Sequence, residues 1–186
     1  MKINSSAYQE APPGFQPMPH ILLHPQIPKP MHGLAPRTIL GQAWWDNERQ
    51  AAYAKYNQHC WACGVHRDNA LPTHWLEAHE MYDINYESGT MQYVFACALC
   101  TLCHKYIHFG KLTEDCKIGK VTPELLLTVK KHGRSLLSYA EVLGKAIKPR
   151  TIAPWSSWRL ILDGREYPGL WPSYEAWKAH YSSAED

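Results

Sequence analysis

Long apolar runs are missing from this 186-residue sequence. No stretch approaches the roughly 20 consecutive apolar residues that cross a bilayer as a helix, so we expect no membrane-spanning segment. The first residues, MKINSSAYQEAPPGF, lack the basic-then-apolar pattern of a secretory signal. Six cysteines in such a chain favour thiolate metal ligands over disulfides. The sequence therefore predicts a cytoplasmic protein.

A strong net charge is also missing. The formal net charge is only +2, so the chain as a whole gives no indication of a polyanionic partner. Between positions 109 and 150, however, nine basic residues face four acidic ones, a local excess of five. Such a surface can follow the phosphates of DNA, or it can be an ordinary solvated helix face. The candidate nucleic-acid-binding residues within it are Lys130, Lys131 and Arg134.

Proline content divides the chain into three predicted segments. Eight prolines between Pro12 and Pro36 exclude regular helix and predict an arm over residues 1–43, whose scattered apolar residues can pack on the rest. A module over 44–120 begins with a predicted helix at 44–59. The segment 121–186 begins with a predicted helix over 123–143, which Thr122 caps and Gly133 interrupts. A strand over 158–162 and a turn at 163–164 follow. The last predicted element is a helix over 174–181 that Ser173 caps.

Two Cys-x-x-Cys pairs are the strongest signal in the sequence. CWAC places Cys60 and Cys63 on one tight turn, and CTLC does the same for Cys100 and Cys103, with 36 residues between the pairs. Zinc prefers four such soft ligands in a tetrahedron. We therefore predict one structural zinc ion bound by these four thiolates. Cys97 forms a further Cys-x-x-Cys pattern with Cys100, but it follows an apolar run and is predicted to be a buried strand residue.

Histidines cluster around the second cysteine pair. His104 and His108 are four residues apart, so on a helix they project from one face and can share a metal ion. His79 and Glu80 belong to HWLEAHE, on a predicted strand ahead of the loop. Other interpretations remain open at this stage. His104 can instead hydrogen-bond a zinc thiolate. Glu77 is predicted to face solvent on the strand, and His66 and His74 are predicted to lie on the surface or in turns. Trp61 and Trp75 are predicted to be packing residues.

These motifs resemble the HNH endonucleases, also called ββα-metal nucleases, and in particular their phage and bacterial branch with a zinc-binding cysteine frame. The resemblance covers about residues 60–110, in the order Cys-x-x-Cys, His-containing strand, loop, and LCTLCHKYIH at the start of a helix. It implies structural zinc on the four cysteines and His104 and His108 as ligands of a second, catalytic divalent ion (Mg²⁺, Mn²⁺, Ni²⁺ or Zn²⁺).

The resemblance leaves two assignments open at the strand. In one, His79 is a metal ligand and Glu80 stands where the family has its general-base histidine. In the other, His79 is the base, and Glu80 binds the metal or orients His79. The family's loop asparagine has no clear counterpart, since Asn85 lies closer to the first motif.

The predicted fold is therefore α+β, a zinc-stapled ββα core flanked by helices and the proline-rich arm. The predicted function is metal-dependent hydrolysis of DNA phosphodiester bonds. The alternative is a non-catalytic zinc module for nucleic-acid or protein interaction that retains the frame. Glu80 and the missing asparagine favour this alternative, whereas His79, His104 and His108 together favour the enzyme.

Overall fold

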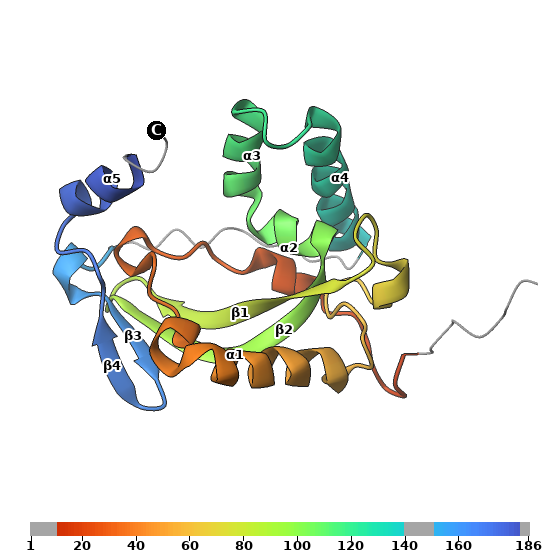
Figure 1. Cartoon of the computed structure of the whole chain (residues 1–186), viewed down its shortest axis with the longest axis horizontal. Coiled ribbons are helices and arrows are strands. Elements are labelled where there is room, and N and C mark those ends of the chain that lie inside the picture. Colours follow the sequence, from red (N-terminus) through yellow and green to blue (C-terminus); the bar gives the residue numbers. More distant parts are fainter. Residues whose placement is uncertain (1–10, 140–150, 183–186) are drawn as a thin grey trace, which may run out of the picture. The chain divides into compact units, whose positions relative to one another are not determined.

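The computed structural model describes residues 11–139 and 151–182, which form a mixed α+β protein (Figure 1). The predicted α+β class is confirmed. The described residues contain five α-helices and a four-stranded sheet. The helices are α1 (Pro36–Lys55), α2 (Thr101–Ile107), α3 (Phe109–Lys117), α4 (Pro123–Tyr139) and α5 (Tyr174–Ser182). The strands are β1 (Leu76–Asn85), β2 (Thr90–Cys100), β3 (Arg159–Leu162) and β4 (Arg165–Pro168). Short 3₁₀ helices are η1 (Pro19–Leu23), η2 (Lys29–Met31), η3 (Arg67–Asn69) and η4 (Trp155–Ser157).

The sheet has the order β1-β2-β3-β4, which makes β1 an outermost strand. A tight turn joins β1 to β2, and Figure 1 shows the two strands as a long hairpin that leads into α2. The Asn85 side-chain oxygen accepts hydrogen bonds from the backbone N–H groups of Glu87 and Ser88, both at 3.0 Å. Gly89 completes the turn at φ +73°, a conformation that favours glycine. Because β1 and β2 are neighbouring strands joined by this turn, the start of β1 lies beside the end of β2, where α2 begins.

The remaining strands extend the sheet from β2. β2 pairs in parallel with β3, with Met91 opposite Leu160. β3 then pairs with β4 in antiparallel fashion. The connection is the predicted turn at Asp163 and Gly164, which have φ values of 49° and 73°, as two-residue hairpin turns require.

The described residues divide into two compact units. Unit 1 contains 11–24, 49–79 and 96–139, and unit 2 contains 25–48, 80–95 and 151–182. Each unit draws on all three of the predicted segments 1–43, 44–120 and 121–186. β1 and β2 each contribute residues to both units.

The core of unit 1 forms around α2 and α4, which pack against each other and against η1. Gly133 makes this packing close, because a Cβ at that position would overlap the ring of Tyr106 on α2. The predicted interruption of the helix at Gly133 is therefore wrong. The glycine lies inside continuous helix α4, and its role is contact with α2.

The core of unit 2 consists of buried residues from the arm, β2, β3 and the segment before β3. They are Met31, Met91, Ala153, Trp158 and Leu160. An aromatic group at α5 adds to this unit, where Lys29 lies 4.7 Å from the centre of the Trp177 ring. The Trp171 indole N–H donates to the His32 carbonyl at 3.0 Å.

Two helix predictions are accurate at their N-termini. Thr122 Oγ1 accepts from the Leu125 N–H and Ser173 Oγ from the Ala176 N–H, so both predicted caps are confirmed. Helix α4 is described to Tyr139, and the predicted residues 140–143 lie outside the described residues. The helix predicted at 44–59 is wrong in its bounds. α1 begins at Pro36, contains non-helical Gly41, and ends at Lys55, because Asn57 and Gln58 adopt positive φ.

The arm is more structured than predicted. Its described part forms η1, η2 and the first turns of α1, so the predicted exclusion of regular helix is wrong from Pro36 onwards. Ile21, Leu22 and Met31 are buried, so the predicted packing of the arm is confirmed. Trp61 is buried as predicted, whereas Trp75 is 56% exposed, and its predicted packing role is wrong.

Candidate metal centres

The four predicted zinc ligands lie together in unit 1. Their sulphur atoms all fall within 4.8 Å of one another, and the Sγ atoms of Cys63 and Cys100 are 3.8 Å apart. A tetrahedral zinc ion with Zn–S bonds of about 2.3 Å places its sulphurs about 3.8 Å apart. All four cysteines are free thiols, and three of them are buried. The cluster therefore has the ligand chemistry and the spacing of a structural zinc site.

Local backbone structure explains how the two pairs meet. Cys60 and Cys63 lie on a turn closed by a hydrogen bond from the Gly64 N–H to the Cys60 carbonyl at 2.8 Å, with Gly64 at φ +79°. Cys100 ends β2, and Cys103 lies in the first turn of α2. Cys97 is buried within β2 and lies outside the cluster, as predicted.

A histidine that the sequence analysis did not single out completes this region. His132 of α4 places Nε2 3.2 Å from Cys103 Sγ, within hydrogen-bonding range of sulphur. Hydrogen bonds from Cys103, Cys60 and Cys63 lower the pKa of Cys100 below its ordinary value, which favours a thiolate in the cluster. The alternative that His104 bonds a zinc thiolate finds no support, because His132 holds that position and His104 has another partner.

A second cluster contains His79 of β1 together with His104 and His108. Their ligand nitrogens lie within 4.8 Å of one another. His79 Nδ1 and His108 Nε2 are 3.3 Å apart, close to the roughly 3.4 Å expected for two nitrogens on a tetrahedral ion with bonds of about 2.1 Å. His108 is the cap between α2 and α3, and its N–H donates to the His104 carbonyl at 3.2 Å. The predicted i,i+4 pair and the strand histidine do converge.

Burial favours the neutral form of two of these imidazoles, His79 and His108. His79 is 5% exposed, and its desolvation, followed by its imidazole neighbours, lowers its pKa to about 2. The same causes lower the pKa of His108 to about 4. Part of this crowding comes from His24 at the end of η1, whose ring meets that of His79 edge to face at 5.2 Å. Neutral imidazole is the form that ligates metal ions.

His79 also has an unsatisfied atom. Its Nε2 is buried and has no hydrogen-bond partner among the described residues. Nδ1 is the nitrogen that faces His108, and one imidazole offers a single nitrogen to an ion, so the spacing and the unsatisfied Nε2 do not describe the same ligand atom. The donor set and its spacing fit a divalent metal ion with nitrogen ligands.

The predicted solvent-facing position of Glu77 is wrong. Glu77 Oε2 accepts from His104 Nδ1 at 2.6 Å, and Oε1 accepts from the Thr101 hydroxyl at 2.8 Å. The hydrogen bond from His104 is the main cause that lowers the pKa of Glu77. Side chains two apart on a strand share a face, so the spacing of Glu77 and His79 in LEAHE was the available signal.

Glu80 does not join the histidine cluster. Adjacent residues of a strand point to opposite faces, so its side chain leaves the face that carries His79. Its Oε1 lies 3.9 Å from Arg37 Nε, an ion pair within unit 2. The structure therefore separates the two residues that the sequence analysis grouped as catalytic candidates.

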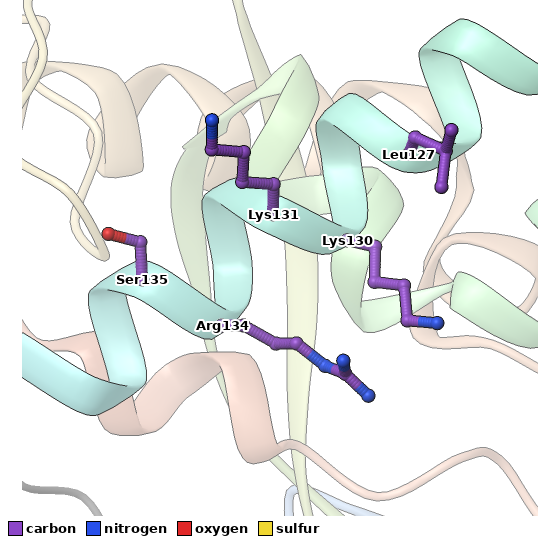
Figure 2. Close-up of a pocket in the computed structure, with 5 residues that line it drawn as sticks. All are labelled: Leu127, Lys130, Lys131, Arg134 and Ser135. Carbon is purple, nitrogen blue, oxygen red and sulfur yellow. The ribbon is translucent and has the colours of Figure 1, made fainter.

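The basic candidates lie along the surface of α4. Lys130, Lys131 and Arg134 line a shallow depression with Leu127 and Ser135 (Figure 2). Lys130 and Arg134 are one helical turn apart, and Figure 2 shows their side chains extending to the same side. Two of the three cations therefore extend to one side of α4, and the Lys131 side chain extends to another side (Figure 2).

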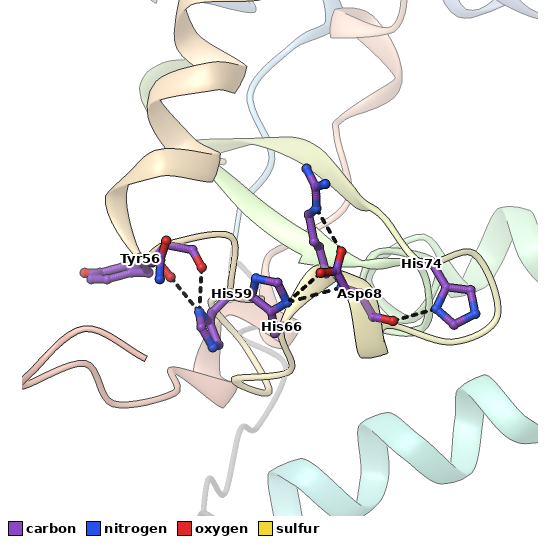
Figure 3. Close-up of polar contacts among 7 residues, drawn as sticks. Tyr56, His59, His66, Asp68 and His74 are labelled. Carbon is purple, nitrogen blue, oxygen red and sulfur yellow. Dashed lines mark hydrogen bonds and ion pairs between the residues drawn. The ribbon is translucent and has the colours of Figure 1, made fainter. Parts of the chain in front are cut away.

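Two further histidines organise the loop before β1 (Figure 3). His66 Nδ1 accepts from the Asp68 N–H at 3.3 Å, and the His66 ring packs on His59 at 5.0 Å. His66 is buried, so its predicted surface position is wrong. His74 lies in a turn as predicted, at φ 56°, with Nδ1 2.7 Å from the Asp68 carbonyl oxygen. Neither belongs to a candidate metal cluster among the described residues.

No protein-family model, curated protein or solved structure matches this chain. The two clusters themselves therefore carry the functional conclusion. Within the described part of the chain, none of the helices has the length and apolarity needed to cross a membrane.

Proposed function

We propose that this protein is a metal-dependent endonuclease of the HNH type that hydrolyses DNA phosphodiester bonds. The observation that carries the proposal is the convergence of His79 from β1 with His104 from α2 and His108 from the C-terminal cap of α2, with ligand nitrogens within 4.8 Å of one another. The cysteine cluster at the junction of β2 and α2 supports it, because structural zinc there would fix the start of that helix.

Each group has a distinct role in this proposal. Cys60, Cys63, Cys100 and Cys103 hold structural zinc. His79, His104 and His108 hold the second ion, and the low pKa of His79 suits a ligand better than a proton acceptor. A divalent ion at this position would stabilise the negative charge that develops on the phosphate and the leaving oxygen. Lys130, Lys131 and Arg134 would bind DNA phosphates without sequence preference.

Glu80 is the candidate general base, but its placement favours a second candidate function, that of a non-catalytic binding module. Its carboxylate pairs with Arg37 and lies outside the histidine cluster. If no base acts at the cluster, the fold is a non-catalytic zinc module that binds nucleic acid or protein. Glu80→Gln tests whether Glu80 is the general base of DNA cleavage, because loss of a general base slows a reaction about 100- to 10,000-fold without loss of metal.

The test is a plasmid-nicking assay on the full-length, zinc-loaded protein with Mg²⁺, Mn²⁺, Ni²⁺ or added Zn²⁺. We expect nicking with at least one ion, and its loss in His104→Ala and His108→Ala variants that retain zinc and fold. His74→Ala, on an exposed histidine outside the cluster, is the matched control and should nick like the wild type. Absence of nicking with every ion would contradict the endonuclease proposal and favour the binding-module function.

A further inference from the structure

We propose that Glu77 is a positioning residue that links the two metal sites. Thr101, which lies inside the second Cys-x-x-Cys motif, anchors the Glu77 carboxylate, and this carboxylate orients the ring of His104 for metal binding. The inference rests on the proposed metal site at the histidine cluster, and it assigns roles to Glu77, Thr101 and Thr73 that metal ligation by itself does not require.

The hydrogen bonds fix which nitrogen of His104 is available. An ionised carboxylate only accepts hydrogen bonds, so His104 Nδ1, 2.6 Å from Glu77 Oε2, must carry the hydrogen. In the neutral form, which is the form that binds metal ions, an imidazole has one hydrogen, so Nε2 then keeps its lone pair. Ligating histidines commonly donate their other N–H to a carboxylate in this way, which fixes the ring and raises its basicity.

The second carboxylate oxygen is held as firmly. The Thr101 hydroxyl donates to Glu77 Oε1 at 2.8 Å, and Thr73 Oγ1 lies 2.7 Å from Thr101 Oγ1. Because the Thr101 hydroxyl donates its only hydrogen to the Glu77 carboxylate, the Thr73 hydroxyl must be the donor to Thr101 Oγ1. The hydrogens then run in one direction along Thr73, Thr101 and Glu77. With one oxygen bound by Thr101 and the other by His104, Glu77 serves as an anchor and not as a metal ligand.

Thr101 connects this network to the cysteine cluster. It stands between Cys100 and Cys103, is buried, and begins α2. Thr101 and His104 are three residues apart in the helix and lie on one face, so Glu77 can reach both. Zinc binding by the flanking cysteines would hold Thr101 in place, and through Glu77 it would hold the ring of His104.

The experiment measures Co²⁺ binding to full-length protein already loaded with zinc, by calorimetry and visible absorption. A Co²⁺ ion at the histidine cluster lacks sulphur ligands, so its absorption differs from that of Co²⁺ displaced into the cysteine cluster. Glu77→Gln should weaken Co²⁺ binding about 10- to 100-fold while zinc content stays at one per chain. Asp83→Asn is the matched control, since Asp83 is an exposed carboxylate on β1 at the same alternation.

A second pair of variants tests the anchor without touching a charged group. Thr101→Val keeps the shape but removes the hydroxyl, and it should weaken Co²⁺ binding about two- to tenfold, the value of one hydrogen bond. Thr101→Ser restores the hydroxyl and should bind like the wild type. Wild-type affinity in Glu77→Gln, or equal affinities in the Val and Ser variants, would overturn the inference. Failure of the zinc-loaded wild type to bind Co²⁺ would remove the metal site of the proposed function together with this inference.

Discussion

The cysteine and histidine clusters both take ligands from α2, but they differ in how deeply those ligands are buried. Three of the four cysteines are buried, and the fourth, Cys63, is partly buried with its Sγ 3.8 Å from Cys100 Sγ, so the cluster is largely closed to solvent. In the histidine cluster, His79 is buried but His104 and His108 are only half-buried. A closed four-ligand site suits a structural ion, and a three-ligand site with exposed members leaves room for a further group. The difference predicts that loss of the first site costs folding and loss of the second costs chemistry.

Removal of a cysteine should have the largest effect. Cys103→Ser should release zinc and unfold unit 1, because structural zinc in small sites contributes roughly 10–16 kcal/mol of apparent binding free energy at neutral pH. Elemental analysis and circular dichroism on heating measure both losses. Cys116→Ser is the control, since Cys116 lies outside both clusters and should leave zinc content and melting unchanged. A folded, metal-free wild type after strong chelation would contradict the structural role of the cysteines.

Removal of the histidine ligands should separate metal binding from folding. The double variant His104→Ala with His108→Ala should lose the second ion and keep the cysteine-bound zinc. With the ion gone, DNA nicking should fall at least 100-fold, whereas the melting temperature should change by only a few degrees. Calorimetric titration with Mn²⁺ or Ni²⁺ gives the stoichiometry. Unfolding of the double variant to the extent seen for Cys103→Ser would erase the distinction between the clusters.

The contact between α2 and α4 should have an intermediate effect. Gly133→Ala places a methyl group against the Tyr106 ring and should destabilise unit 1 by about 1–3 kcal/mol, as overpacking typically does. Gly110→Ala is the matched control in α3, where a Cβ meets nothing within 4 Å. It should be neutral or stabilise by about 0.5–1 kcal/mol, the usual gain of alanine over glycine in a helix. Urea denaturation compares the two, and equal signs would contradict the close packing of α4.

The basic surface of α4 should have the smallest effect on either cluster. Replacing Lys130, Lys131 and Arg134 together with Gln should weaken duplex DNA binding and lower the slope of log K against log salt by up to about 2.7. Fluorescence anisotropy at several salt concentrations measures this slope. Zinc content and Co²⁺ binding should stay as in the wild type. An unchanged slope would reduce these residues to a solvated helix surface.

The sequence predicted local features well because short-range geometry determines them. A capping hydroxyl acts within three residues, as Thr122 and Ser173 do, and the Asp163-Gly164 turn depends on two positive φ values. The end of α1 was missed because Asn57 and Gln58 set it through positive φ values rather than through periodicity. Its start was missed because the helix runs from Pro36 past non-helical Gly41. The reason for Gly133 was missed because its partner, Tyr106, belongs to another helix.

The sequence by itself determined the two Cys-x-x-Cys pairs, the His104–His108 spacing and the mixed α+β class. Only the tertiary structure decided which side chains these groups meet. Glu77 reaches His104 across 27 residues, and His132 reaches Cys103 across 29. Glu80, one residue from His79, is directed to Arg37 instead. Spacing along a helix or strand fixes which face a residue occupies, but its partner depends on how the hairpin, α2 and α4 pack together.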